Sequence, residues 1–121
     1  MLGTMATKQE VIVALKRWID LLETNAELAD EFRGYNKTFL ITLPDMKLSV
    51  QMVFEGTNKA HLVEGTVANP DMSLTVDSKL FLDICRGEVD PMEAFMTGRL
   101  KPKGNMADLQ KLEVFMDLFE G

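Results

Sequence analysis

The amino-acid sequence predicts an α+β fold, in which a five-stranded sheet carries helices packed on one face. The spacing of apolar residues is helical over residues 7–34, becomes alternating over residues 38–55, and turns helical again from residue 78. Residues that begin helices or form turns bound each of these segments. Because a sheet with one apolar face must cover that face, helices packed against it are the economical architecture.

Length and composition limit the classes of protein that this chain can be. Its 121 residues allow one domain with one core, residues 1–121. A net charge of −6 and a pI near 4.7 oppose binding to nucleic acid, which selects basic surfaces. The single cysteine, Cys85, excludes an intramolecular disulfide, and no apolar run is long enough for a secretory signal or a membrane span. We therefore expect a cytoplasmic protein.

Two helices are predicted before the first strand. Thr7 with Glu10 three residues later forms a capping-box pattern, and an apolar stripe from Val11 to Leu22 follows it. Asn25 begins a second, shorter helix, which ends at Gly34.

Four strands follow. Residues 38–43, 46–55 and 60–65 alternate or are bounded by turns, and the short connections at 44–45 and 56–59 predict an antiparallel meander. In the second strand the even positions from Met46 to Phe54 face the core. Asn69-Pro70 then separates the meander from a fourth strand at residues 72–76.

The C-terminal third predicts three helices and one strand. A helix begins at Asp77 or Ser78, a shorter one begins at Asp90-Pro91, and the last covers residues 106–120. Between the last two lies the strand RLKPKG, residues 99–104. Pro102 cannot donate a ladder hydrogen bond, so this strand belongs at a sheet edge, where its cations prevent edge-to-edge pairing. A phosphate site is the alternative reading of the cations, although no Walker loop is present.

Residues 71–112 resemble the C-terminal half of the sterol carrier protein 2 (SCP2) family. The motifs that carry the resemblance are Phe81-Leu82, Asp90-Pro91 with Ala94-Phe95, Gly98-Arg99-Leu100-Lys101, and Lys103-Gly104-Asn105-Met106. The resemblance implies a five-stranded α+β domain with an apolar tunnel between sheet and helices. That tunnel would take a fatty acid, a fatty acyl-CoA, a sterol-like molecule or a phospholipid, and it would need no cofactor. The family's peroxisomal C-terminal address is missing, so we expect a free-standing microbial type.

The sequence departs from the family in its last predicted strand and its last predicted helix. Pro102 stands where the family has an aliphatic residue, Asp108 and Gln110 replace apolar residues, and Glu113 replaces a common glutamine. These changes bear on the polarity of the tunnel. Arg99, Lys101 and Lys103 are candidates for contact with a phosphate or coenzyme A headgroup.

From the resemblance and the apolar pattern we predict the side chains that bind the ligand. Most are apolar, and Gln110 and Glu113 are the polar candidates. The predicted wall consists of Trp18, Phe39, Ile41, Met52, Phe54, Leu74, Phe81, Phe95, Met96, Met106, Leu109, Gln110, Leu112, Glu113, Phe115 and Met116.

The nine methionines have two interpretations. Met fills gaps in ordinary cores, and it also forms surfaces that adapt to ligands of varied shape. Six of them are expected on inward faces: Met52, Met72, Met92, Met96, Met106 and Met116.

Residues suited to catalysis or metal binding are few. His61 is expected to face solvent and Cys85 to lie in the core, and neither a nucleophile motif nor a metal-ligand spacing occurs. We therefore predict no catalytic residue, no metal site and no cofactor. An enzyme acting on a lipid through His61 or Cys85 remains an alternative, as does an accessory subunit that presents a lipid or quinone-type substrate to an enzyme complex.

The last helix ends in VFMDLFEG, residues 114–121, which is apolar around more of its circumference than one core-facing stripe requires. We expect it to cover the tunnel mouth or to pack on a second subunit as a homodimer. Transient contact with a membrane is a further expectation for a lipid carrier.

Overall fold

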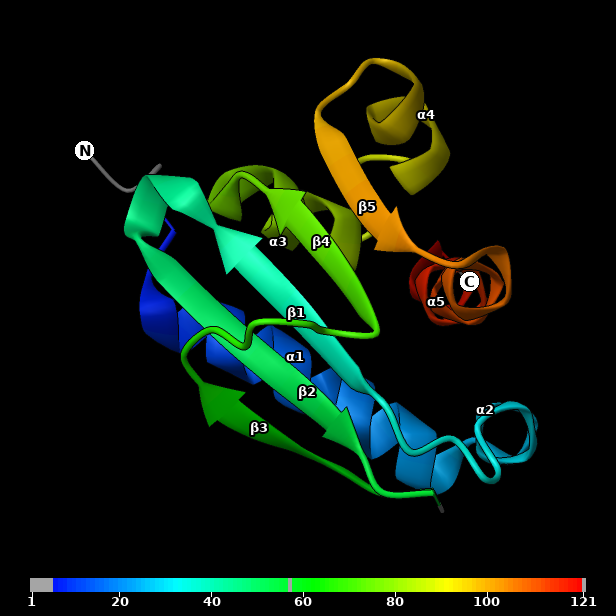
Figure 1. Cartoon of the computed structure of the whole chain (residues 1–121). Coiled ribbons are helices and arrows are strands. Elements are labelled where there is room, and N and C mark those ends of the chain that lie inside the picture. The colour runs from blue at the N-terminus through cyan, green and yellow to red at the C-terminus, as the bar shows by residue number, and fades with distance from the viewer. Residues whose placement is uncertain (1–5, 57, 121) are drawn as a thin grey trace.

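A mixed sheet forms one layer of the protein, and helices cover one of its faces (Figure 1). The structure is a computed structural model that describes residues 6–56 and 58–120, without the side chains of residues 112 and 115–120. The five strands lie in the order β3-β2-β1-β4-β5. Their bounds are β1 Thr38–Leu43, β2 Leu48–Phe54, β3 Ala60–Glu64, β4 Met72–Val76 and β5 Leu100–Gly104. The predicted α+β class and its five strands are confirmed.

The first three strands form the predicted antiparallel meander, whereas β4 pairs with β1 in parallel. Parallel pairing requires the chain to return to the same end of the sheet, and the segment 65–71 makes this return across the face opposite the helices (Figure 1). The amide of Gly65 donates to the carbonyl of Ser49 at 2.8 Å, and that of Asp71 donates to the carbonyl of Thr38 at 3.1 Å. Leu40, in the middle of β1, is only 8% exposed.

Helix α1 (Lys8–Thr24) lies behind the meander. Its N-terminus has the predicted capping box, in which the Glu10 amide donates to the Thr7 hydroxyl at 3.2 Å and the Thr7 amide donates to the Glu10 carboxylate at 2.9 Å. Helix α2 (Ala26–Glu31) follows, and its Leu28 amide donates to the Asn25 side chain at 3.1 Å. Both helix starts therefore lie where the sequence predicts them.

The turn between β1 and β2 also supplies the N-terminal cap of a helix that begins much later in the chain. Residues Pro44–Met46 form a 3₁₀ turn (η1), and Lys47 takes a left-handed conformation with φ of 53°. Met46 therefore belongs to the turn, and the predicted start of the second strand at residue 46 is wrong by two residues. From this turn the Asp45 carboxylate accepts the amide of Ser78 at 3.0 Å and also its hydroxyl. Asp45 thus caps helix α3 (Ser78–Cys85), because the local cap residue, Asp77, makes no side-chain capping bond.

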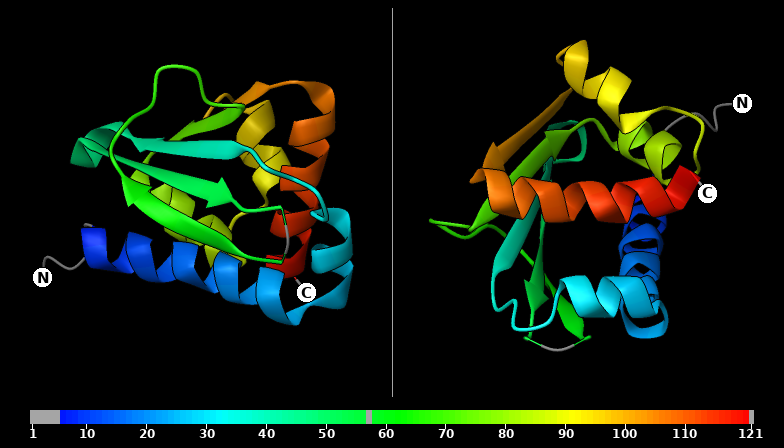
Figure 2. Two further views of the ribbon diagram at one scale, coloured as in Figure 1. Left: turned by 60° about the horizontal axis from the view of Figure 1, so that its bottom comes forward. Right: turned by 90° about the vertical axis from the view of Figure 1, so that its right-hand side faces the viewer.

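Helices α4 (Pro91–Met96) and α5 (Met106–Glu120) flank the edge strand β5. Figure 2 shows α5 running along one end of the molecule, from the sheet layer to the helix layer. It contacts β5, α3 and α2. The Asp108 amide donates to the Asn105 side chain at 2.8 Å, so Asn105 caps this helix.

Candidate ligand-binding site

Seven residues of the predicted ligand wall lie in the core between sheet and helices. All are at most 3% exposed. They are Trp18, Phe39, Ile41, Met52, Phe54, Leu74 and Phe81. The strands β1, β2 and β4 place five of them there because inward positions alternate along a strand, and the helices α1 and α3 supply Trp18 and Phe81.

Direct ring contacts fill the centre of this core. The Trp18 indole stacks on Phe39 with ring centroids 6.2 Å apart, and it lies 5.8 Å from Phe81 at a tilt of 47°. These rings join α1, β1 and α3, so side chains of the two layers meet at this point. The predicted tunnel cannot pass between Trp18 and β1 unless these rings separate.

A second aromatic cluster lies at the end of the sheet nearest α2 and α5. Phe32 stacks on Phe54 with centroids 4.9 Å apart, and Tyr35 meets both rings edge-on at 5.2 Å. The ammonium group of Lys111, from α5, lies 5.5 Å from the centroids of Phe32 and Tyr35. This cation–π contact ties the second turn of α5 to the cluster.

Beside this cluster lies an ion pair in which only the carboxylate is fully buried. The Asp108 carboxylate is 2% exposed and lies 3.1 Å and 3.3 Å from the ammonium group of Lys37. Burial and the adjacent Asp108 carboxylate both raise the pKa of Tyr35, which stays protonated at neutral pH. Asp108 therefore anchors the start of α5 to Lys37, the residue just before β1, a role that the sequence did not indicate. The signal in the sequence was that Asp108 is a carboxylate at a position where the family has an apolar residue.

Five other predicted wall residues do not lie inside the core. Phe95, Met96 and Met106 are 51%, 77% and 71% exposed, and Gln110 and Glu113 are exposed as well. Leu109 is half-buried. The prediction that Met92, Met96 and Met106 face inward is wrong: α4 buries only Pro91 and Ala94, and Met106 is exposed at the first residue of α5. Met52 and Met72 do face inward.

The remaining predicted wall residues, Leu112, Phe115 and Met116, lie outside the described side chains. Only the helical backbone is described there, as part of α5. Val114, in the same helix, is half-buried and packs against the core. The prediction that the end of this helix covers a tunnel mouth or a second subunit therefore stays a prediction.

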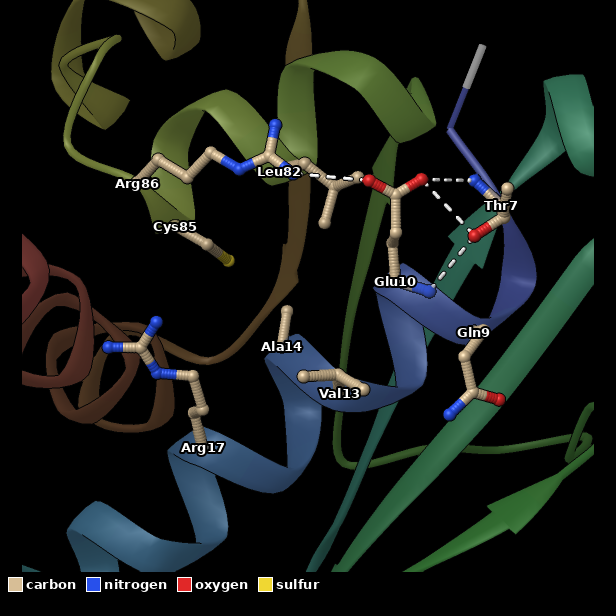
Figure 3. Close-up of a pocket in the computed structure, with 9 residues that line it drawn as sticks. All are labelled: Thr7, Gln9, Glu10, Val13, Ala14, Arg17, Leu82, Cys85 and Arg86. Carbon is tan, nitrogen blue, oxygen red and sulfur yellow. Dashed lines mark hydrogen bonds and ion pairs between the residues drawn. The ribbon is translucent and has the colours of Figure 1, made fainter. Parts of the chain in front are cut away.

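A surface groove lies between α1 and α3 (Figure 3). It has a volume of about 280 Å³, with Val13, Ala14 and Leu82 among its apolar lining residues. Arg86 reaches across it to the Glu10 carboxylate at 3.2 Å, and Arg17 projects from α1 at its other end (Figure 3). No strand residue lines this groove, so it is separate from the predicted tunnel.

The groove also contains the only cysteine of the sequence. Burial raises the pKa of the Cys85 thiol to about 12, although a hydrogen bond with Trp18 and the charges of Arg17 and Arg86 act in the opposite direction. The thiol is therefore protonated at neutral pH and unsuited to act as a nucleophile.

A larger and more open cavity, of about 650 Å³, lies between α3 and the β4–β5 edge. Lys79, Arg99 and Lys101 are among the cations that line it. Two of the three acids on its wall have partners of their own, since Asp83 pairs with Lys79 at 2.9 Å and Asp45 binds Ser78. Arg99 and Lys101 are thus brought together with Lys79 at one surface.

The described residues give little support to catalysis or metal binding. His61 is exposed on β3, as expected, and its Nδ1 lies 3.0 Å from the Glu55 carboxylate. Within residues 6–56 and 58–120, no three His, Cys, Asp or Glu side chains form a group suited to a metal ion. None of the described helices is both long and apolar enough to cross a membrane.

The fold and its core define a small α+β domain whose inner sheet face is covered by helices through aromatic contacts. A sequence model of the SCP-2 sterol transfer family matches residues 15–117, and the chain belongs to this family. The family expected from residues 71–112 is thereby confirmed.

Two curated relatives are similar in sequence. The chain is 25% identical over 113 residues to the non-specific lipid-transfer protein-like 1 of Caenorhabditis elegans, covering 93% of each chain. It is 29% identical over 72 residues to the mouse peroxisomal multifunctional enzyme type 2, covering 60% of this chain. The chain spans only 9% of the length of that enzyme, so the family domain also occurs inside longer enzymes.

Solved structures share the fold. The sterol carrier protein domain 2 of Helicoverpa armigera superposes with a TM-score of 0.70 at 20% identity, covering 98% of this chain and 96% of that one. A UbiJ-SCP2 ubiquinone synthesis protein superposes with a TM-score of 0.66 at 14% identity, covering 93% and 99%.

Proposed function

We propose that this protein binds hydrophobic ligands and transfers them without chemical change, with a fatty acid, fatty acyl-CoA, sterol-like molecule or phospholipid as cargo. Membership of the SCP-2 sterol transfer family over residues 15–117 carries this proposal. The raised pKa of Cys85 and the exposed position of His61 are consistent with a carrier rather than an enzyme. We propose that the protein meets its cargo inside the cell.

The cargo space is proposed to lie beneath β4 and β5 rather than beneath the meander. The Trp18 ring contacts occupy the interior behind β1. The inward residues Met72 and Leu74 of β4, by contrast, lie opposite Gly104 and Pro102 of the edge strand β5, and α5 contacts both β5 and α3. Movement of α5 about its Asp108 anchor would open this space to a hydrocarbon chain.

Hydrocarbon burial alone supplies enough free energy for such binding. Each buried methylene is worth about 0.8 kcal/mol, so a sixteen-carbon chain gains roughly 12 kcal/mol before the costs of ordering are subtracted. One methylene more or less changes affinity by only about 1–3 kcal/mol. Selection is therefore expected by length and bulk.

Methionine methyl groups offer a direct test of the binding place. We would record their NMR signals while titrating stearate that carries a nitroxide near its methyl end. Signals of Met72 should broaden strongly, and those of Met52 behind the meander should broaden less. Exposed Met96 serves as the control for contact with free ligand. Uniform broadening, or none, would contradict the proposed location, and native mass spectrometry of gently purified protein would identify the natural cargo.

A second candidate function is that of an accessory subunit which presents a lipid or quinone-type substrate to an enzyme complex. The observation that favours it is the structural likeness to a ubiquinone synthesis protein of nearly the same length. Affinity purification from the native host distinguishes the two candidates. An enzyme that co-purifies in fixed proportion would support the accessory role, and a free protein loaded with lipid would support the carrier.

A further inference from the structure

Positive charge is concentrated at one place in an acidic protein. The chain has a net charge of −6, yet between Glu93 and Asp108 it has no acidic residue and three basic ones. These are Arg99, Lys101 and Lys103, on or beside the edge strand β5, and all three are exposed. Within the described part of the chain they take part in none of the ion pairs, and Arg99 only donates to the Thr97 hydroxyl at 3.1 Å.

Large apolar side chains are exposed at both ends of the same strand. Phe95 and Met96 close helix α4 before β5, and Met106 opens helix α5 after it. They are 51%, 77% and 71% exposed. Figures 1 and 2 both show α4, β5 and the start of α5 along the same side of the molecule. We call these six residues the β5 surface: apolar groups at each end with cations between them.

The β5 surface is poorly suited to pairing with another strand. Among the described residues, β5 pairs with β4 alone and its other edge is open. Pro102 has no amide hydrogen to donate there, and a second copy of the same edge would bring lysines against lysines. Neither a second copy nor an acidic peptide would cover Phe95, Met96 and Met106 together with the cations as fully as a broad surface would.

We propose that the β5 surface docks this protein on bilayers that contain anionic phospholipids. Phosphate groups would lie against Arg99, Lys101 and Lys103, while the apolar side chains enter the boundary between headgroups and acyl chains. The inference rests on the proposed carrier function, because a carrier must meet a membrane to load or release its cargo. It also places the contact beside β4 and α5, where the cargo space is proposed.

Vesicle flotation tests this docking. Vesicles of phosphatidylcholine with about 30% phosphatidylglycerol should bind the wild-type chain far better than pure phosphatidylcholine, and about 0.5 M NaCl should remove the difference. The variant R99Q/K101Q/K103Q should bind the anionic vesicles about 100-fold more weakly. The variant F95S/M96S should lose about tenfold, because two apolar side chains no longer enter the boundary.

The matched control is K16Q/K47Q/K59Q, which removes the same charge from exposed lysines elsewhere. Its vesicle binding should stay within about threefold of wild type, since distant charges are screened. Circular dichroism shows whether each variant is folded. Equal weakening by both triple variants, or equal wild-type binding to neutral and anionic vesicles, would overturn the proposal. A wild-type dimer that R99Q/K101Q/K103Q dissociates would overturn it in favour of a second copy.

Palmitate and palmitoyl-CoA binding without vesicles separates this proposal from the carrier function. A wild-type chain that binds neither ligand contradicts the carrier function, while vesicle flotation still decides docking. If R99Q/K101Q/K103Q loses palmitoyl-CoA binding and keeps vesicle binding, the cations serve the headgroup of a soluble ligand and docking is overturned. Loss of vesicle binding alone supports docking.

Discussion

The two halves of the sheet, the meander β1–β3 and the strands β4 and β5, differ in how far the side chains on and around them are buried. Behind the meander, Trp18 stacks on Phe39 and inward residues of β1 and β2 are almost fully buried. At the other half, the edge strand β5 is bordered by exposed Phe95, Met96 and Met106, and its exposed cations take part in none of the ion pairs among the described residues. The first half has the properties of a rigid core, and the second those of a contact surface. Stability and ligand handling are therefore expected to depend on different residues.

Truncation of Trp18 is the strongest test of the rigid half. Trp18→Ala removes the ring that joins α1, β1 and α3, and it should lower the free energy of unfolding by about 3–5 kcal/mol. Trp18→Phe keeps a ring in the same place and should cost clearly less. Chemical denaturation measures both variants. A loss from Trp18→Ala below about 1 kcal/mol would show that the core does not depend on this contact.

The Lys37–Asp108 pair tests the junction between the two halves. Lys37→Met leaves the Asp108 carboxylate buried without its cation, although Lys37 itself is 38% exposed. We expect a loss of about 2 kcal/mol in urea denaturation. Lys16→Met, at an exposed lysine of α1, is the matched control and should cost less than about 0.5 kcal/mol. Similar losses in the two variants would remove the anchoring role of Asp108.

The Asp45 cap links the meander turn to α3 and predicts a pH dependence. Desolvation alone would raise its pKa, but the Ser78 hydroxyl and amide outweigh this and hold the pKa of Asp45 below its ordinary value of 3.8. The stabilisation is thus complete above pH 3.8 and is lost as the pH falls through the lower folded value. Asp45→Asn should cost about 1–2 kcal/mol at neutral pH.

Thermal unfolding at several pH values measures this effect. The difference between wild type and Asp45→Asn should shrink as the pH falls from 3.8 and should be lost once the pH is below the folded pKa of Asp45. Asp20→Asn, an exposed position of α1, provides the control for general charge removal. A difference that persists unchanged in acid would mean that the carboxylate charge is not what stabilises α3.

The smallest effect is expected in the contact half. Met96→Ser should change the free energy of unfolding by less than about 0.5 kcal/mol, because the side chain is already 77% exposed. The same change at buried Met72 should cost about 2–4 kcal/mol. Differential scanning calorimetry of the two variants compares the halves directly. Equal losses would show that Met96 packs in solution as the sequence pattern predicts.

Local signals predicted most of the fold. The capping box at Thr7, the cap at Asn25 and the alternation in β1 and β4 each act within a few residues, so the local sequence contains the information that they need. For the same reason the seven buried wall residues on long periodic elements were predicted correctly as inward. Whether they touch a ligand stays a prediction.

The errors fall where periodicity has little power. Helix α4 has only six residues, and Met106 is the first residue of α5. In such short or terminal stretches the spacing of apolar residues does not show whether a given side chain faces the core or the solvent. Which face is covered depends on neighbours that the local sequence does not specify. Met92, Met96 and Met106 were accordingly assigned to the wrong side.

By itself the sequence determined where most helices and strands begin, which positions of the long elements face inward, and which family the chain resembles. These properties follow from backbone hydrogen bonding and side-chain spacing, which act over one or two turns of chain. Only the tertiary structure decided the parallel pairing of β1 with β4, the capping of α3 by Asp45 and the burial of Asp108 beside Lys37. Each joins residues more than thirty positions apart, so each depends on which surfaces pack together rather than on any local preference.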